Sequence, residues 1–147
     1  MLTKSVTIYD RGPDGIYLHP SAFSEMGVLV AIPPFVHLAM AEKEPRIWRE
    51  VVALMESSGG RVSHPKPGDD ILRPLYQMAG CSNWQAFVRK ATSCAIDIVD
   101  GQFIVSPEIR DESGFGSSKE AKIALGLNPT ESEGKAAVLA ALRLESM

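Results

Sequence analysis

Several features that define large classes of proteins are absent from this sequence of 147 residues. No apolar stretch approaches the roughly 20 residues that a membrane-spanning helix needs. The longest apolar run covers residues 27–32 and ends at Pro33 and Pro34. The first residues show no basic segment followed by an apolar core, so a secretory signal peptide is not expected. The sequence therefore predicts a protein that neither spans a membrane nor is exported.

Cysteine is also scarce. Cys81 and Cys94 are the two cysteines of the sequence, and they do not form a CxxC pair. A disulfide between them is geometrically conceivable, but the missing secretion signal favours a reducing compartment and free thiols. We therefore expect a cytoplasmic protein.

The charge balance argues against a further class of function. The sequence has 15 lysines and arginines against 18 aspartates and glutamates, which gives a formal net charge of −3. A nonspecific nucleic-acid binder needs a surplus of cations to displace phosphate counterions, so direct binding to nucleic acid is not expected. With 45% hydrophobic and 22% charged residues, the composition is that of a globular protein. The length suits a single domain over residues 1–147.

Residues that could perform chemistry are scattered along the chain. His19, His37 and His64 each lack a cysteine or carboxylate at ligand spacing, so neither a metal site nor another cofactor is expected. The pairs at residues 69–70 and 111–112 could be catalytic carboxylates. A helix N-cap explains the first pair more simply, and a solvated loop explains the second. Since no nucleophile, base and acid converge in the sequence, we do not expect an enzyme.

The first half of the sequence predicts two strands and one helix. Residues 5–9 alternate polar and apolar side chains, as a half-buried strand does, and residues 10–15 are turn-forming. Residues 27–32 are continuously apolar, which is typical of a central strand covered on both faces. Pro45 fits the first turn of a helix that runs to about Ser58. One apolar stripe lies along this predicted helix, formed by Ile47, Trp48, Val51, Leu54 and Met55.

The next segments predict two further helices. Residues 70–79 form the first, in which Pro74 either bends the helix or delays its start. Ser82 and Gln85 have the spacing of a capping box, which predicts a helix that begins at residue 82. Trp84 and Phe87 lie on one face of that helix, and we expect both in the core.

The clearest local signal is a hairpin. Residues 92–99 and 102–106 are β-like runs joined by Asp100 and Gly101, a pair that favours a type I′ turn. Residues 110–120 are polar and contain glycine, which predicts an exposed loop, and residues 122–125 predict a short edge strand. Thr130 and Glu133 form a second capping box, which opens a C-terminal helix whose inward residues are Ala137, Val138, Ala141 and Leu142. The whole pattern predicts the α+β class, with a mixed, largely antiparallel sheet packed by helices.

Several of these segments resemble the immunity proteins of bacterial contact-dependent growth inhibition systems. The stretch SNWQAFVRKA at residues 82–91 is similar to a signature of the form S-W-x-x-F-V-K-x-A in that family. The resemblance continues through residues 96–104, residues 106–108 and the Gly114-Phe115 pair, and it ends with the helix at residues 130–144. Upstream, residues 8–15 and 27–30 stand in the expected order. Ser113 and Gly114 occupy the place where the family has a doubled glycine, so the resemblance does not extend to the geometry of that loop.

The resemblance implies a function without catalytic residues. Such an immunity protein binds the C-terminal toxin domain of a large surface exoprotein, commonly a nuclease, and blocks it in the cytoplasm. Carboxylates would steer a basic toxin toward its inhibitor and help to discriminate cognate from foreign toxins. The expected contact residues are acidic residues in predicted turns and loops: Asp10, Asp14, Glu25, Glu108, Asp111 and Glu112.

Two other classes of function remain open from the sequence. The first is a small cytosolic hydrolase or transferase that uses the scattered carboxylates, which would require a deep pocket gathering two of them. The second is a structural or regulatory subunit of another system.

Overall fold

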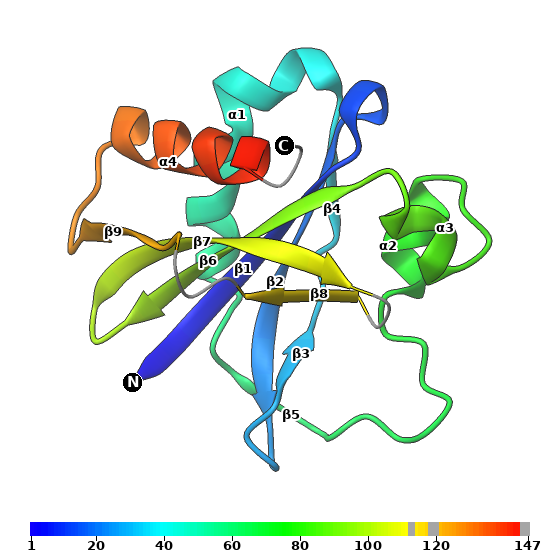
Figure 1. Ribbon diagram of the computed structural model, residues 1–147. Coiled ribbons are helices and arrows are strands. Elements are labelled where there is room, and N and C mark those ends of the chain that lie inside the picture. Colours follow the sequence, from blue (N-terminus) through cyan, green and yellow to red (C-terminus); the bar gives the residue numbers. More distant parts are fainter. Residues whose placement is uncertain (112–113, 118–120, 145–147) are drawn as a thin grey trace.

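The strands of this protein form one curled sheet (Figure 1). The computed structural model describes residues 1–111, 114–117 and 121–144. The strands are β1 (Leu2–Asp10), β2 (Ile16–Ser24), β3 (Leu29–Ala31), β4 (Val36–Leu38), β5 (Arg61–Val62), β6 (Thr92–Val99), β7 (Gln102–Asp111), β8 (Gly114–Ser117) and β9 (Ile123–Gly126). The main order is β3-β2-β1-β6-β7-β8, while β4 and β5 pair with β2 and β9 pairs with β7. Every pairing among these strands is antiparallel except that of β5 with β2.

Helices cover both faces of this sheet. They are the 3₁₀ turn η1 (Gly12–Asp14), α1 (Met40–Met55), α2 (Arg73–Met78), α3 (Trp84–Val88) and α4 (Glu131–Leu144). Figure 1 shows α1 and α4 together on one side and α2 and α3 together at the far end of the sheet. The predicted α+β class, with a mixed and largely antiparallel sheet, is confirmed. No helix in the described part of the chain is long and apolar enough to cross a membrane.

The main hydrophobic core lies between the sheet and the helices α1 and α4. Successive side chains of a strand point to opposite faces, so alternate residues of the four central strands face these helices. The predicted stripes of both helices are confirmed as buried. Burial of each large aliphatic side chain stabilises the fold by about 1.5–3 kcal/mol. The core includes Val6, Ile8, Ile16, Leu18, Ile96 and Val105 from the sheet, Ile47, Trp48 and Val51 from α1, and Val138, Ala141 and Leu142 from α4.

Strand β2 was not predicted from the sequence because His19 and Pro20 interrupt its pattern. Proline lacks the N–H that a strand ladder uses and is tolerated where no partner needs it. Along the same edge of β2, β4 pairs with Ile16–Leu18 and β3 with Ser21–Phe23, so Pro20 lies between the two ladders. Its carbonyl still accepts a hydrogen bond from the N–H of Ile32, at 3.0 Å.

The prediction of a central strand at residues 27–32 was wrong. β3 is shorter and stands at the end of the main strand order. Val28 and Leu29 are 48% and 38% exposed, so the apolar run is not covered on both faces. The central position belongs instead to β1 and β6, which pair with each other along most of their lengths.

Helix α1 begins five positions before the predicted start at Pro45. The side chain of Glu42 accepts a hydrogen bond from the N–H of Ala39, at 3.1 Å, and this contact caps the helix. The extra turns carry no apolar stripe, and Met40 is 62% exposed, so periodicity could not reveal them. Pro45 lies inside the helix, where its missing N–H removes a backbone hydrogen bond. Figure 1 shows the helix bending near its start, as a proline kink does.

The helices α2 and α3 both begin later than the sequence predicted. Pro74 occupies the first turn of α2, so the alternative in which it delays the helix is the correct one. Asp69 and Asp70 are not the N-cap, since Leu72 holds that position. In α3 the N-cap is Asn83 rather than Ser82, and the side chain of Asn83 accepts the N–H of Ala86 at 2.8 Å.

A second hydrophobic cluster lies where these two helices cover one end of the other sheet face. Phe87 is fully buried there, between Tyr9 and Tyr17. Trp84 is only half-buried, which corrects its predicted place in the core; its ring stacks on that of Phe87 with centroids 5.1 Å apart. The buried members of this cluster are Tyr9, Tyr17, Leu75, Tyr76, Phe87 and Ala91.

The predicted hairpin is confirmed between β6 and β7. Asp100 and Gly101 both have positive φ, at 51° and 80°, as a type I′ turn requires. The predicted loop at residues 110–120 was wrong in part, since β7 extends to Asp111 and β8 pairs with it. The short strand predicted at residues 122–125 is β9, and the capping box of Thr130 and Glu133 is confirmed at α4.

Candidate functional site

The face of the sheet opposite α1 and α4 carries mainly polar side chains in three rows. Because cross-strand partners stand side by side, the strand register defines each row across β2, β1, β6 and β7. Small hydroxyl side chains recur in every row, and four of the five serine and threonine residues are at most 5% exposed. The rows are Ser21–Ser5–Asp97–Ile104, His19–Thr7–Ala95–Ser106 and Tyr17–Tyr9–Ser93–Glu108.

Eight residues of these rows form the floor of a groove of about 360 Å³, which is within the size range of ligand pockets. We call it the polar groove. Leu29 and Ala31 of β3 and Leu72 before α2 form an apolar wall along it. The remaining lining residues, which come from β1, β2, β6 and β7, are Ser5, Thr7, Tyr9, His19, Ser21, Ala95, Asp97 and Glu108.

The imidazole of His19 lies buried in this groove and is fully hydrogen-bonded. Its Nδ1 stands 2.9 Å from the carbonyl oxygen of Pro20, and a carbonyl can only accept, so Nδ1 carries the proton. Its Nε2 therefore accepts from the hydroxyl of Tyr9, at 3.1 Å. Burial lowers the pKa of His19 to about 4 and raises the pKa of Tyr9. Both groups are consequently neutral at pH 7.

Two carboxylates stand at different ends of the polar groove. Asp97 accepts a hydrogen bond from Oγ of Ser5 at 2.7 Å, and Glu108 accepts one from Oγ of Ser93 at 2.7 Å. The register places them two rows and one strand apart, so their Cα atoms are about 14 Å apart. Each carboxylate is therefore hydrogen-bonded to a serine of its own row.

The predicted contact residues are distributed over separate surfaces. Asp10 at the end of β1 pairs with Lys43 and accepts the N–H of Gly12, and its side chain is 13% exposed. Asp14 in η1 pairs with the buried Arg11, and its side chain is 51% exposed. Glu25 is exposed in the turn after β2. β2 separates Asp10 from Glu25, and nine residues of strand span about 26 Å between their ends.

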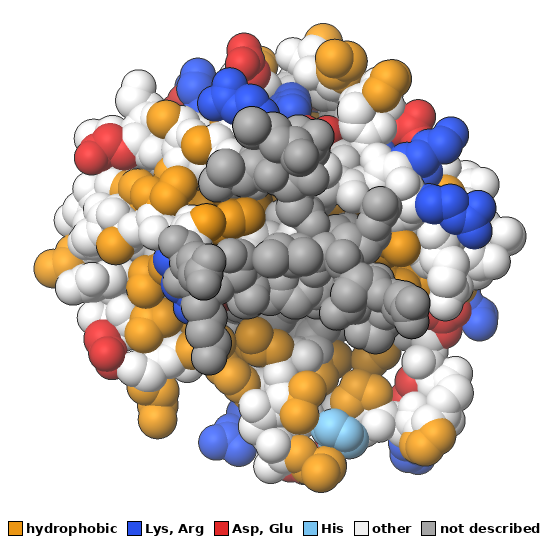
Figure 2. Space-filling model, in the orientation of Figure 1, with side chains coloured by type: hydrophobic (Ala, Val, Ile, Leu, Met, Phe, Trp, Pro, Cys, Tyr) orange, Lys and Arg blue, Asp and Glu red, His pale blue; other side chains and the backbone are white. Residues whose placement is uncertain are grey.

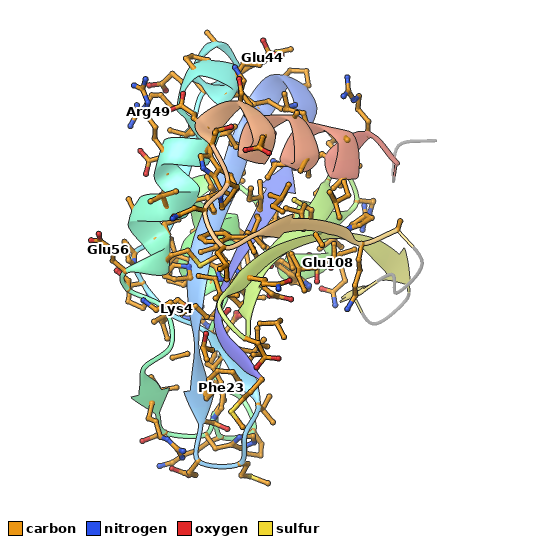
Figure 3. All side chains as sticks on the ribbon, turned by 90° about the vertical axis from the view of Figure 1, so that its left-hand side faces the viewer. Lys4, Phe23, Glu44, Arg49, Glu56 and Glu108 are labelled. Atoms are coloured by element: carbon orange, nitrogen blue, oxygen red, sulfur yellow. The ribbon has the colours of Figure 1, made fainter. Side chains whose placement is uncertain are left out.

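The other three predicted contact residues lie on or beyond β7. Glu108 is half-buried in the polar groove, and Figure 3 shows it on the side of the sheet away from α1. Asp111 is the last residue of β7. Glu112 lies outside the described residues. The structure thus brings one of the six predicted residues into the polar groove.

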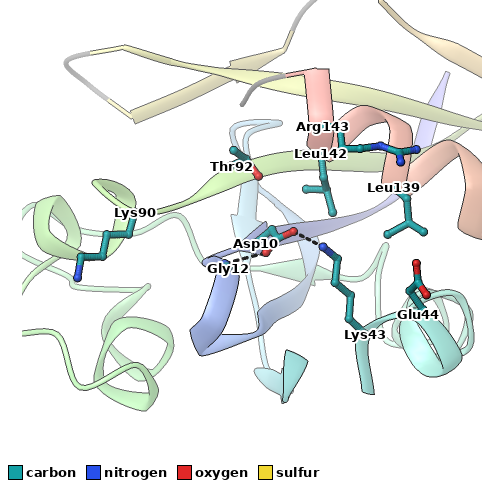
Figure 4. A pocket seen from close by; sticks show the side chains of 9 residues that line it. All are labelled: Asp10, Gly12, Lys43, Glu44, Lys90, Thr92, Leu139, Leu142 and Arg143. Atoms are coloured by element: carbon teal, nitrogen blue, oxygen red, sulfur yellow. Dashed lines mark hydrogen bonds and ion pairs between the residues drawn. The ribbon is translucent and has the colours of Figure 1, made fainter. Parts of the chain in front are cut away.

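A second hollow, of about 330 Å³, surrounds Asp10 (Figure 4). Figure 4 shows Lys43 of α1 directed at Asp10, with Glu44 and Leu139 beside it and Lys90 extending away. Charges of both signs line this hollow, and the carboxylate of Asp10 is already paired with Lys43.

Among the described residues, no group of three histidine, cysteine or acidic side chains could hold a metal ion. The two cysteines lie in different clusters and do not form a disulfide with each other: Cys94 is buried in the main core, and Cys81 is half-buried beside α3.

Sequence reasoning missed Asp97, Tyr9 and His19 as candidate site residues. The available signal was the alternation in residues 5–9, where polar side chains occupy the positions opposite the core residues Val6 and Ile8. That alternation identifies a polar face, but only the pairing of β1 with β2 and β6 places the three rows beside one another.

Comparison with known proteins shows the fold. No protein-family model matches the chain, and no curated protein matches it in sequence. The structure is similar to a protein of unknown function from Neisseria meningitidis, with a TM-score of 0.74, 13% identity and coverage of 96% of this chain and 94% of that one. It is also similar to a chain of the CdiA-CT/CdiI toxin and immunity complex from Yersinia pseudotuberculosis, with a TM-score of 0.72, 12% identity and coverage of 95% of each chain. At such low identity the likeness shows a shared fold.

Proposed function

We propose that this chain is an immunity protein that binds the C-terminal toxin domain of a contact-dependent growth inhibition exoprotein and neutralises it in the cytoplasm. The observation that carries the proposal is the fold likeness to a chain of the CdiA-CT/CdiI complex, which covers 95% of each chain. The ordered motifs that resemble this family, above all residues 82–91, support the same assignment.

The proposed activity is occlusion of the toxin rather than catalysis. In the polar groove His19 is neutral and has both ring nitrogens hydrogen-bonded. Asp97 and Glu108 each accept a hydrogen bond from a serine hydroxyl of their own row, and the two rows are different. A face built in this way suits recognition through shape and hydrogen bonds better than proton transfer, because the groups do not converge on one reacting atom.

Charge would guide the encounter with the toxin. A nuclease carries a basic surface because it must approach phosphates, and carboxylates on its inhibitor steer association. Asp10, Asp14, Glu25, Glu108, Asp111 and Glu112 remain the proposed contact residues. Asp14 and Glu25 are the most accessible of those whose side chains are described, whereas Asp10 is engaged by Lys43.

The test is to co-express this chain with the toxin domain encoded next to its gene. We expect protection of the producing cells and a complex with nanomolar or tighter affinity, which corresponds to about −12 kcal/mol, measured by calorimetry on the purified pair. Absence of both protection and binding would contradict the proposal. Growth arrest caused by this chain alone would place it on the toxin side of such a pair.

The role of accessible charge has a separate test. Asp14→Asn and Glu25→Gln are expected to slow association with the toxin and to reduce its salt dependence, because rim charges act mainly on encounter. Glu56→Gln is the matched control, since Glu56 is an exposed carboxylate at the C-cap of α1 (Figure 3) and is not among the proposed contact residues. Equal association rates for all variants would leave immunity intact and contradict the steering role.

A further inference from the structure

The polar groove combines an acidic end with an apolar wall. Asp97 stands at the end where Ser5 and Ser21 share its row. The wall residues Leu29, Ala31 and Leu72 also line an adjoining apolar hollow of about 220 Å³. Figure 2 shows hydrophobic side chains gathered at the lower part of the molecule, where Figure 1 draws β3 and β5. A side chain entering here would meet aliphatic carbon first and oxygen atoms at the floor.

Asp97 bears a charge that the surrounding protein balances only weakly. Its one hydrogen-bond donor among the described residues is the hydroxyl of Ser5. No described cation lies within ion-pair distance of it; Lys122, just before β9, acts on it only through the longer-range field and is itself exposed. Burial raises the pKa of Asp97 above its ordinary value. A cation placed beside this carboxylate would gain more than it would on an open surface, because part of the desolvation has already occurred.

A second polar feature lies on the same face of the sheet. The hydroxyl of Ser106 is buried, the residue being 1% exposed, and it has no hydrogen-bond partner among the described residues. Ser106 pairs with Ala95 and is two residues from Glu108, and both of those residues line the groove. Buried hydroxyls normally find a partner, so this one adds an unsatisfied polar atom beneath the same face of the sheet.

We infer that the polar groove binds a lysine or arginine side chain of the partner protein, and that the carboxylate of Asp97 forms an ion pair with its cationic head. The inference rests on the proposed function for the identity of the partner as a toxin domain. The long side chains of lysine and arginine combine an aliphatic stem with a cationic head, so the stem contacts Leu29 and Leu72 while the head reaches Asp97. Among the described residues that line the groove there is no lysine or arginine, so none of these residues repels the cationic head.

The groove can be tested without the toxin. The probes are Nα-acetyl-arginine amide and its neutral isostere Nα-acetyl-citrulline amide, each titrated into the isotope-labelled chain and followed by NMR. We expect saturable shifts at the Asp97 side-chain carboxyl and at the amides of Ser5 and Thr7 with the arginine probe, and much weaker ones with citrulline. Equal responses to the two probes, or no saturable shift at these residues, would overturn the inference.

Substitution of Asp97 then tests whether its carboxylate binds the arginine probe. Asp97→Asn keeps an oxygen that can accept the Ser5 hydroxyl, so the fold should survive, and the urea midpoint checks this. We expect affinity for the arginine probe to fall about tenfold, the usual effect of losing a charge-assisted contact, while Glu56→Gln leaves it unchanged. An unchanged affinity in Asp97→Asn contradicts the inference.

The same variants separate this inference from the proposed function. If the toxin binds Asp97→Asn as tightly as the unmodified chain, the basic side chain does not enter the groove, yet the immunity function stands. If the unmodified chain binds no toxin but still binds the arginine probe through Asp97, the proposed function fails while the groove keeps its chemistry. A toxin complex weakened by Asp97→Asn and unaffected by Glu56→Gln supports both.

Discussion

Protonation of His19 should make the stability of this protein depend on pH between about 4 and 6.5. The folded chain holds His19 neutral, 3% exposed and hydrogen-bonded at both ring nitrogens, and burial lowers its pKa from 6.5 to about 4. In this window the unfolded chain binds a proton that the folded chain does not. The free energy of unfolding therefore rises with pH across the window and falls as pH decreases.

The size of the effect follows from the two pKa values. Linkage between a pKa of 6.5 in the unfolded chain and one of about 4 in the folded chain gives a loss of about 2 kcal/mol at pH 5 relative to pH 7.5. That is a considerable share of the roughly 5–15 kcal/mol that stabilises a typical domain. Asp97 acts in the opposite direction, because its raised pKa favours the protonated folded chain at low pH.

The assay compares urea denaturation of the unmodified chain and His19→Asn at pH 7.5, 6 and 5. Asparagine can still donate to the carbonyl of Pro20 but does not titrate, and Asp97, His37 and His64 are present in both proteins. The difference in unfolding free energy between the two should therefore change by about 2 kcal/mol from pH 7.5 to pH 5. A difference that stays constant with pH would show that His19 is not held neutral by burial.

Three further experiments test the packing. In Gly134→Ala the new Cβ would lie 2.2–2.6 Å from ring atoms of Trp48, so we expect a loss of about 1–3 kcal/mol although alanine favours helices by about 1 kcal/mol; a variant with a higher urea midpoint would refute this. Phe87→Ala should lower the free energy of unfolding by about 3–5 kcal/mol and Trp84→Ala by clearly less, because Phe87 is fully buried and Trp84 is half-buried. If urea denaturation gave the reverse order, the burial of the two rings in α3 would be contradicted. A thiol reagent should modify Cys81 in the folded protein but Cys94 only on unfolding, since Cys94 is 0% exposed; mass spectrometry that finds both modified at the same rate would contradict the burial of Cys94.

Local sequence determined much of the fold. The Asp100-Gly101 hairpin depends on positive φ at two adjacent residues, and the start of α4 depends on reciprocal hydrogen bonds between Thr130 and Glu133. Interactions within four residues define both features, so their patterns can be read directly from the sequence. The apolar stripe of α1 is equally local, whereas its first turns, which carry no such stripe, were missed.

Strands whose partners are distant in sequence could not be predicted in the same way. β2 contains Pro20, and a proline within a run argues against a strand. The position is tolerated because Pro20 lies in the gap between β3 and β4, which the sequence does not reveal. β8 depends on its pairing with β7, because its own composition is that of a loop. The apolar run at residues 27–32 indicated burial, but its position at the sheet edge is a property of strand order, which hydropathy does not encode.

The sequence by itself determined the fold class, the hairpin, the capped C-terminal helix and the polar positions of β1. Only the tertiary structure decided that His19, Tyr9 and Asp97 belong to one groove, and that Asp10 and Glu25 stand at opposite ends of β2. The physical reason is that a strand alternates its side chains locally, whereas the register between strands far apart in sequence decides which of those side chains become neighbours.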